Sequence, residues 1–278
     1  MPKELLIFDN SALSRLFEEA ERDRSALLNG LRVFGTPWIS ALNVYETART
    51  PSADLRHAKL RFYGEVSGDI PPIADPMALL ADAARTWRFG GQPEPCDRIA
   101  HQILMTPQAV TDELSAAMTA GMKDQERAFR EMTAQIREAF LTAYGAGDRR
   151  FKTESELMLF FFAMPETAIH GLIAPIFAHW TGSALAPTET SDLLRMPVWR
   201  VFMAGQIHAL WLRAADKNIA SPKRTGIFDT DSAAYLPFCD RFITQDRAQL
   251  ATLIAANEFN ARRTKVETYD ELRGRLLL

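Results

Sequence analysis

Short apolar runs alternate with amphipathic stretches at both ends of the chain, and this alternation constrains the fold more than any other feature. The apolar run Leu5–Phe8 stops at Asp9, and Ser11 then opens an amphipathic stretch over residues 12–29. Gly30 follows, at a position where glycine commonly ends a helix. We therefore predict a strand, a turn and a helix, which is the beginning of a βαβ unit in a parallel sheet.

The same pattern continues beyond this first unit. Extended segments are predicted over residues 31–34 and 37–39, and Ser40 is the expected N-cap of a second helix that reaches about Arg49. Near the other end the expected elements, in chain order, are a helix from Asp229 through Leu236, a strand over Asp240–Thr244, a helix over Arg247–Asn257, a strand over Lys265–Glu267 and a helix over Asp270–Leu277.

The middle of the chain has a different pattern, which is helical from about residue 53 to 216. Apolar residues over 114–140 recur at intervals of three, four and seven, which predicts one apolar stripe on a long helix. We therefore expect an α/β fold, with a central parallel sheet flanked by helices and a large all-α insertion. The α/β part is expected to comprise residues 1–52 and 218–278, and the helical insertion residues 53–217.

Composition and charge exclude several classes of protein. The 278 residues are 47% hydrophobic and 24% charged, which argues against wholesale disorder. A net charge of −3 excludes a strongly basic protein that coats nucleic acid without specificity. Cys96 and Cys239 form no disulfide or zinc pattern, which suits a reducing cytoplasm. There is no signal-peptide pattern, and prolines and polar residues interrupt the best membrane candidate, Leu157–Trp180, so we expect a cytoplasmic protein without membrane contact.

Four carboxylates are expected to gather at one edge of the sheet, because ligands of open parallel sheets bind beyond the carboxyl ends of the strands. Asp9 follows the first strand, and Asp246 follows the strand that Thr244 ends. Glu46 lies on the helix after the second strand, and Asp229 opens a later helix. Such oxygen ligands suit Mg²⁺ or Mn²⁺, and a divalent cation would relieve the repulsion within the cluster.

Each acidic position also has a purely structural interpretation. Asp9, Asp229 and Asp246 stand where a helix N-cap is favoured, and the helix dipole alone favours an acid there. Glu46, taken alone, is more often a solvated helix residue. Asp231 is an alternative to Asp229 as a ligand, although its spacing to the following alanines fits less well.

Three segments together resemble the signature segments of the PIN-domain (PIN-like) nucleases: IFDNSAL at 7–13, ISALNVYE at 39–46 and FDTDSAAYLPFCDRFITQD at 228–246. The family pattern is Asp-x-Ser/Thr after the first strand, a Glu on the second helix, an Asp that opens a later helix, and Thr-x-Asp at the end of the following strand. The resemblance covers roughly the first 50 and the last 60 residues and implies a PIN-like sheet. The long helical middle departs from the compact family form.

This resemblance implies a divalent-metal-dependent ribonuclease that hydrolyses phosphodiester bonds to 5′-phosphate and 3′-hydroxyl ends, with Mg²⁺ or Mn²⁺ as cofactor. The matching catalytic metal ligands are Asp9, Glu46, Asp229 and Asp246. Asp9 would be the central ligand, which bridges the metal positions, and the Ser11 and Thr244 hydroxyls would orient the ligands. Five cations near the expected cleft are candidates for contacts with substrate phosphates: Arg15, Arg49, Lys223, Arg224 and Arg247.

Two other functions compete with the nuclease. The first is a catalytically inactive PIN-like scaffold that binds RNA or protein through its helical insertion. The second is a phosphatase of the haloacid-dehalogenase type, which would need a second aspartate where Ser11 stands. RNA, single-stranded or structured, is the expected partner. The sequence leaves open an antitoxin or other protein partner, a homodimer, the choice of RNA over DNA, and a toxin, maturation or defence role.

Overall fold

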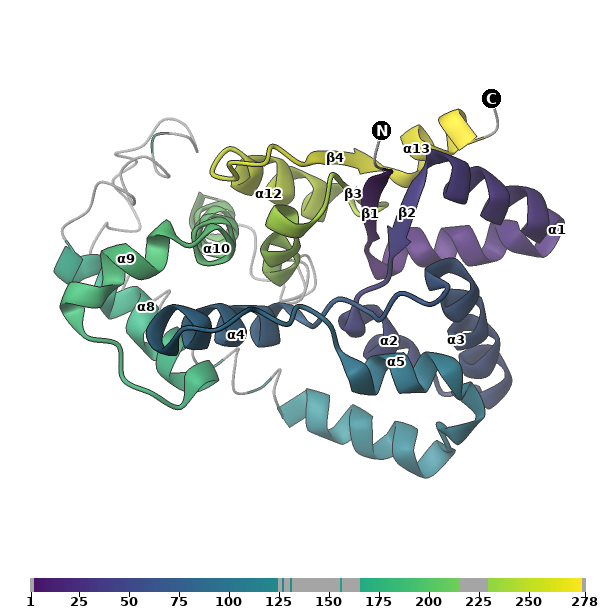
Figure 1. Ribbon diagram of the computed structural model, residues 1–278, viewed down its shortest axis with the longest axis horizontal. Helices are drawn as coiled ribbons and strands as arrows, with labels where there is room; N and C mark the ends of the chain where they lie inside the picture. The colour runs from purple at the N-terminus through teal and green to yellow at the C-terminus, as the bar shows by residue number, and fades with distance from the viewer. Residues whose placement is uncertain are drawn as a thin grey trace.

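A computed structural model of the chain describes residues 3–124, 127, 131, 156, 166–215 and 230–276 (Figure 1). The described residues form an α/β fold with the strands β1 (Glu4–Phe8), β2 (Gly35–Trp38), β3 (Arg241–Thr244) and β4 (Lys265–Thr268). All of these strands are parallel, and they lie in the order β2-β1-β3-β4.

This strand order places a topological switch point between β1 and β3. After β1 the chain adds β2 on one side, and it later returns to add β3 on the other side of β1. The connection from β1 to β2 and the connection from β3 to β4 therefore leave the sheet in opposite directions. A crevice at such a point is the usual ligand site of an open parallel sheet. The register brings Phe8, the last residue of β1, opposite Ile243 of β3.

The α-helices are α1 (Asn10–Phe34), α2 (Ala41–Ala48), α3 (Ala53–Ser67), α4 (Pro76–Phe89), α5 (Arg98–Met105), α8 (Glu166–Thr181), α9 (Thr190–Arg195), α10 (Pro197–Ala215), α12 (Arg247–Asn257) and α13 (Tyr269–Leu276). The 3₁₀ helices are η1 (Pro107–Ala109), η2 (Pro187–Glu189) and η3 (Ser232–Phe238). A further helical segment covers residues 112–124. None of the helices in the described part of the chain combines the length and the apolar character that crossing a membrane requires.

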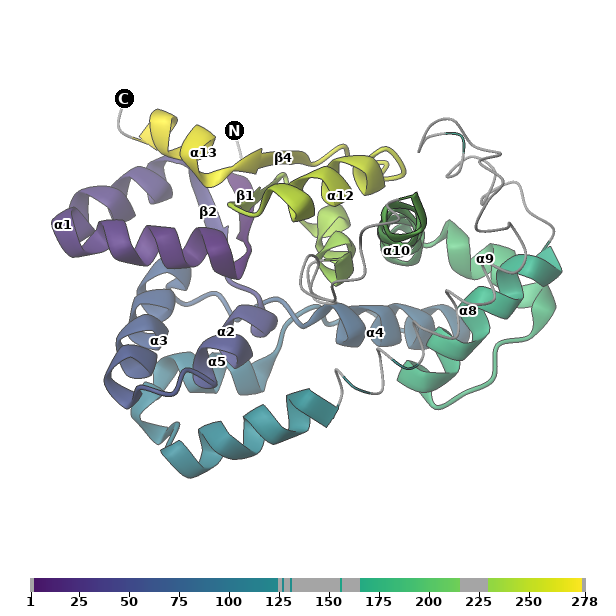
Figure 2. The ribbon, with the colours of Figure 1, turned by 180° about the vertical axis from the view of Figure 1, so that it is seen from behind.

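Two hydrophobic cores lie on opposite faces of the sheet, because successive side chains of a strand point to opposite sides. Leu6, Phe8 and Ile243 belong to one core, which α1, α2, α3, α5 and α13 cover. Ile7 and Phe242 belong to the other core, which α4, α8, α9, α10, η3 and α12 cover. The two ribbon views agree with this division into a sheet with helices on both sides (Figures 1 and 2).

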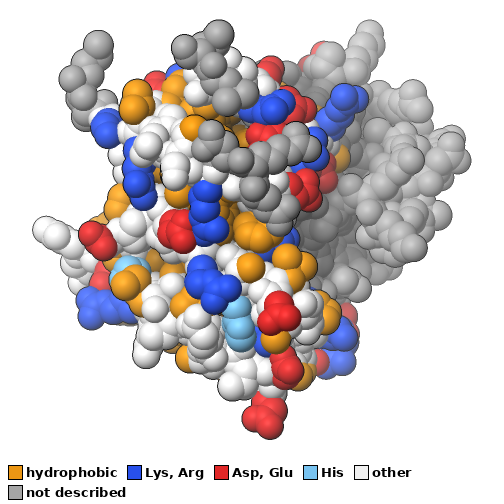
Figure 3. Space-filling view, turned by 90° about the vertical axis from the view of Figure 1, so that its right-hand side faces the viewer, with side chains coloured by type: hydrophobic (Ala, Val, Ile, Leu, Met, Phe, Trp, Pro, Cys, Tyr) orange, Lys and Arg blue, Asp and Glu red, His pale blue; other side chains and the backbone are white. Residues whose placement is uncertain are grey.

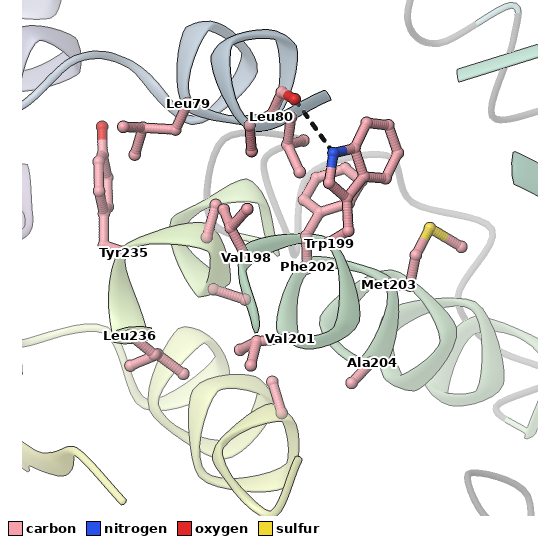
Figure 4. Close-up of a cluster of buried hydrophobic side chains, with 14 of the residues drawn as sticks. Leu79, Leu80, Val198, Trp199, Val201, Phe202, Met203, Ala204, Tyr235 and Leu236 are labelled. Atoms are coloured by element: carbon pink, nitrogen blue, oxygen red, sulfur yellow. Dashed lines mark hydrogen bonds between the residues drawn. The ribbon is translucent and has the colours of Figure 1, made fainter. Parts of the chain in front are cut away.

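Helices from the predicted insertion contribute to both cores. On one side, α3 and α5 pack with α2. On the other side, α10 packs against α12, η3 and α4 (Figure 4). Trp199 of α10 is fully buried there, and its indole N–H donates to the backbone oxygen of Leu80 at 3.0 Å. The proposed boundaries of the insertion stay a prediction, but its described helices complete the same two cores as the sheet.

The structure corrects two expectations for the first helix. Residues 31–34 are helical rather than extended, and Gly30 lies within α1 rather than at its end. Leu31 is completely buried in the core, so tertiary packing extends the helical stripe past the glycine. The helix ends at Gly35, whose backbone N–H donates to Leu31 O. Gly30 instead permits a close approach, since a Cβ there would lie 3.2 Å from the backbone oxygen of Leu276.

The remaining elements at the chain ends agree with the expectations to within one or two residues, apart from the helix expected through Leu236. That segment is the 3₁₀ helix η3, which contains Pro237, a residue that cannot donate within an α-helix. The apolar stripe over 114–140 is described only in its first part, where Leu114 is 42% exposed and Met118 packs against the core. The rest of the stripe and the segment 221–229 lie outside the described residues.

Candidate functional site

A pocket lies at the switch point, at the carboxyl ends of β1 and β3. Its volume is about 190 Å³, and side chains from α1, α2, η3 and α12 contribute to its wall. Three of the four predicted metal ligands, Asp9, Glu46 and Asp246, line it. The volume is below the roughly 300–1,000 Å³ of sites for drug-sized molecules, so the pocket suits an ion or one small group of a larger substrate.

Asp9 stands between β1 and α1 and is the N-cap of α1. Its Oδ1 accepts the backbone N–H of Ala12 at 2.7 Å. Its Oδ2 accepts the hydroxyls of Ser11 at 2.7 Å and of Thr244 at 2.8 Å. Burial raises the pKa of Asp9; these hydrogen bonds oppose the shift, and the nearby charge of Asp246 adds to it. A carboxylate in this environment is stabilised by a proton or by a cation.

The two hydroxyls expected to orient the ligands join the start of α1 to the turn after β3. Ser11 Oγ, which donates to Asp9, also accepts the backbone N–H of Gln245 at 2.9 Å. Thr244 Oγ1 accepts the backbone N–H of Asp246 at 3.0 Å. The same Thr244 oxygen lies 2.8 Å from Asp9 Oδ2 and 2.6 Å from Gln249 Oε1. These bonds connect two segments more than 230 residues apart and fix the Asp9 carboxylate at the pocket wall.

Asp246 is the N-cap of α12. Its Oδ1 accepts the backbone N–H groups of Ala248 at 2.7 Å and of Gln249 at 3.1 Å. The structural interpretation of Asp9 and Asp246 as helix caps is therefore confirmed. Capping does not exclude a second role for Asp246, because both of these bonds use Oδ1 and a carboxylate offers about four acceptor sites.

Glu46 reaches the pocket through the orientation of α2. Ser40, directly after β2 and Ile39, caps α2: its Oγ accepts the backbone N–H of Asn43 at 3.2 Å, and Asn43 Oδ1 in turn accepts the Ser40 backbone N–H at 3.2 Å. This reciprocal capping box fixes where the helix begins. Glu46 comes three residues after Asn43, one helical turn along the same face, and both line the pocket.

The fourth predicted ligand, Asp229, lies outside the described residues. Within the described ranges, no group of three or more His, Cys, Asp or Glu side chains is arranged so that it could hold a metal ion as it stands. The acids therefore share a pocket without forming a complete coordination shell. Carboxylate, hydroxyl and amide oxygens are nevertheless the ligands that Mg²⁺ and Mn²⁺ prefer, so the donor chemistry of the wall fits such an ion.

Asp231, the alternative to Asp229, does not line this pocket. Its side chain is buried, with 2% of the residue exposed, and its Oδ1 accepts the Gln206 side-chain amide at 2.7 Å. A hydrogen bond from a neutral amide stabilises a buried carboxylate without a metal. Asp231 thus joins η3 to α10 within the protein.

The predicted phosphate-binding cations are not on the pocket wall where they are described. Arg15 is half-exposed and lies 3.4 Å from Glu18, and Arg247 is exposed at the first turn of α12. Arg49 Nη1 donates to the sulfur of Met122 at 3.4 Å. Lys223 and Arg224 lie outside the described residues. Figure 3 views the molecule from the end that carries α1 and α3, and the basic side chains visible there are interspersed with acidic and apolar ones.

Asn43 and Tyr235 are among the pocket residues that the sequence-based prediction of the site does not include. Asn43 has a sequence signal, because it stands three residues after the capping serine, but that signal concerns the helix end alone. Tyr235 has no distinct sequence signal, because it lies within the apolar run AAYLPF. In the structure it is only 2% exposed and lines the pocket. Burial raises the pKa of its hydroxyl well above the usual value.

No protein-family model matches the chain, and neither a curated protein nor a solved structure matches it. A functional assignment therefore depends on the chemistry of the pocket and on the motif resemblance.

Proposed function

We propose that the protein is a divalent-metal-dependent ribonuclease of the PIN-like type, which hydrolyses phosphodiester bonds to 5′-phosphate and 3′-hydroxyl ends. One observation carries this proposal: acids at positions 9, 46 and 246, which are distant in the chain, line one pocket at the switch point of a parallel sheet. This is where the sequence predicts an acidic metal site, and it is the usual ligand site of such a sheet.

Asp9 is the best candidate for the central ligand, because it combines burial with a raised pKa and has both oxygens held by hydrogen bonds. Glu46 and Asp246 would hold the cation from the α2 and α12 sides of the pocket. Bound Mg²⁺ or Mn²⁺ would supply Lewis acidity, which activates water at neutral pH and stabilises the leaving oxygen. Asp229 as a further ligand, RNA as the substrate, and an antitoxin or a second copy as a partner stay predictions.

A catalytically inactive scaffold is the second candidate. It is favoured by the capping roles of Asp9 and Asp246, which account for both acids without a cation. It is also favoured by the lack of a complete metal-binding group among the residues that the structure describes. In this alternative the pocket has no catalytic role, and the helical insertion binds RNA or protein.

Substitution of Asp9 distinguishes the two candidates. Asp9→Asn retains the shape of the side chain and an N-cap oxygen but removes the charge, so we expect Mn²⁺-dependent cleavage of RNA to fall by at least about 10³-fold. Asp97→Asn is the matched control, because Asp97 is likewise a helix N-cap, whose Oδ1 accepts the backbone N–H groups of Ile99 and Ala100, and it does not line the pocket. Its activity should equal that of the wild type.

Three outcomes contradict the nuclease. These are cleavage that persists in EDTA, equal cleavage by the Asp9→Asn protein, and no cleavage by the wild type with either Mg²⁺ or Mn²⁺. The last outcome, together with a thermal stability that Mn²⁺ does not change, supports the scaffold.

A further inference from the structure

The Tyr235 hydroxyl is buried in the protein without a hydrogen-bond partner among the described residues. The residue lies on η3 and is 2% exposed, and its ring stacks on that of Phe242 with centroids 6.4 Å apart. Figure 4 shows the side chain extended from η3 towards α4, beside Leu79. The great majority of buried polar side-chain atoms in proteins are hydrogen-bonded, so an unpartnered hydroxyl at a pocket calls for a functional explanation.

This hydroxyl is a donor in the physiological range of pH. Burial and the charges of Asp75, Glu46 and Asp231 raise the pKa of Tyr235, and an interaction with the Ser40 hydroxyl opposes part of this shift. The phenol therefore keeps its proton and can donate a hydrogen bond to a carboxylate.

Glu46 is the acid that lines the same pocket as Tyr235. Of the three carboxylates whose charge acts on Tyr235, Glu46 alone lines the same pocket. Asp75 uses its Oδ1 to cap α4, where it accepts the backbone N–H of Met77 at 2.9 Å. Asp231 accepts the side-chain amide of Gln206. A glutamate has three rotatable bonds, and its carboxylate can accept a further hydrogen bond whatever other contacts it makes.

We propose that Tyr235 is a positioning residue for Glu46, whose carboxylate accepts a hydrogen bond from the Tyr235 hydroxyl when the pocket holds a divalent cation. The bond fixes one Glu46 oxygen towards η3 and so directs the other oxygen at the cation. Carboxylates that hold a metal are themselves generally hydrogen-bonded, and loss of such a supporting bond typically lowers metal affinity 10–100-fold. This inference rests on the proposed function, because it requires a cation in the pocket.

The substitution Tyr235→Phe tests the role, because it removes the hydroxyl alone and keeps the ring against Phe242. We expect the Kd of the full-length protein for Mn²⁺, measured by calorimetric titration, to rise by about 10–100-fold. In EDTA the melting temperature of the same variant should equal or exceed that of the wild type, because the metal-free protein loses an unsatisfied buried polar group. A tyrosine with a merely structural role would show the opposite pair of results.

Tyr45→Phe is the matched control. The Tyr45 hydroxyl donates to Asp97 Oδ2 at 2.8 Å, and Tyr45 does not line the pocket. This variant should melt at a lower temperature than the wild type in EDTA and should bind Mn²⁺ with unchanged affinity.

Two results overturn the role of Tyr235 and leave the proposed function standing. One is a Tyr235→Phe protein that binds Mn²⁺ as tightly as the wild type. The other is a melting temperature in EDTA that falls as far for Tyr235→Phe as for Tyr45→Phe. A wild-type protein that binds neither Mn²⁺ nor Mg²⁺ overturns both the role and the proposed function.

Discussion

Glu4, Asp240 and Glu267, which lie on or beside β1, β3 and β4, are paired with arginine or lysine. Asp9 and Asp246, which follow the carboxyl ends of β1 and β3, are instead held by neutral donors. We call the first group the ion-pair cluster; its members are Glu4, Asp240, Arg241, Arg262, Lys265, Glu267 and Arg275. In the described part of the chain, Asp9 and Asp246 take part in no ion pair and are bound by hydroxyl and backbone N–H groups.

The pKa shifts follow this difference. Burial alone would raise the pKa of Glu267, but its hydrogen bonds to Arg275 and Lys265 and their charges lower it overall. The pKa of Asp240 is lowered by the backbone N–H of Leu5 and by its contacts with arginine. The pKa of Asp9 is raised, because burial outweighs its hydrogen bonds. Charge is thus compensated within the chain in the ion-pair cluster, whereas Asp9 has no basic partner among the described residues, and this is the property that the proposed function uses.

The largest effect on stability is expected in the ion-pair cluster. Glu267→Gln leaves Arg241, Lys265 and Arg275 without their shared carboxylate, whose side chain is only 2% exposed. We expect the free energy of unfolding to fall by about 2–3 kcal/mol, less than for a fully buried network because the basic partners are partly exposed. Urea denaturation at pH 7 measures this change.

The control for Glu267 is the exposed pair of Glu258 with Arg263. Glu258→Gln should change the free energy of unfolding by no more than about 0.5 kcal/mol. Equal losses in the two variants would show that the ion-pair cluster is no more than a set of surface contacts, and the contrast between this cluster and the pocket would fail.

A divalent cation should stabilise the protein by binding in the pocket and not at the ion-pair cluster. At about 100 times its Kd, Mn²⁺ is expected to add about 2.7 kcal/mol, or roughly 5–10 °C in Tm for a chain of this size. Asp9→Asn should abolish the shift, because it removes the central charge. Glu267→Gln should keep the shift even though its baseline Tm is lower, and a thermal melt with and without EDTA compares all three proteins. A shift of equal size in the Asp9→Asn protein would place the cation elsewhere.

Local signals predicted the parts of the pocket that the chain builds from neighbouring residues. The apolar run Leu5–Phe8 followed by Asp9 specifies a strand and a helix start, and the same kind of signal surrounds Thr244. The end of α1 was predicted wrongly, because a glycine inside a buried helix is tolerated when another element packs against it, as α13 does at Gly30. Helix propensity depends only on the segment itself, whereas the helix that packs against Gly30, α13, comes from the opposite end of the chain.

The contribution of Tyr235 could not be predicted for a related reason. The first four residues of its run AAYLPF are all buried, so hydrophobic periodicity does not show which way the hydroxyl points. That direction depends on how η3 packs against α4 and on the position of α2, which are long-range contacts. The prediction for Asp229 stays untested, since the residue lies outside the described ranges.

Removing the charge of Asp9 should also change the stability of the protein when no cation is present. In EDTA at pH 7, Asp9→Asn is expected to raise the free energy of unfolding, because the raised pKa of Asp9 means that the folded state disfavours its charged form. The free energy of unfolding of the wild type is lowered in this way only above the pH at which Asp9 ionises in the unfolded state, where its pKa has the ordinary value of 3.8. The advantage of the variant should therefore be small near that pH, grow as the pH rises through the folded-state pKa, and then stay constant. Urea denaturation from pH 4 to 7 follows it, and an advantage that shrinks with rising pH would contradict the sign of the shift.

The smallest effect on stability, and the sharpest separation of structure from function, is expected at Asp246. Asparagine caps a helix about as well as aspartate, so Asp246→Asn should change the free energy of unfolding by less than about 0.5 kcal/mol. Asp246→Ala, which also removes the cap, should lower it by about 1 kcal/mol. If the charge matters for the pocket, both variants weaken Mn²⁺ binding by the same factor, because both lose it. If Asp246 is only a cap, Asp246→Asn binds Mn²⁺ like the wild type, and the acids that face the cation reduce to Asp9, Glu46 and whatever the segment around residue 229 supplies.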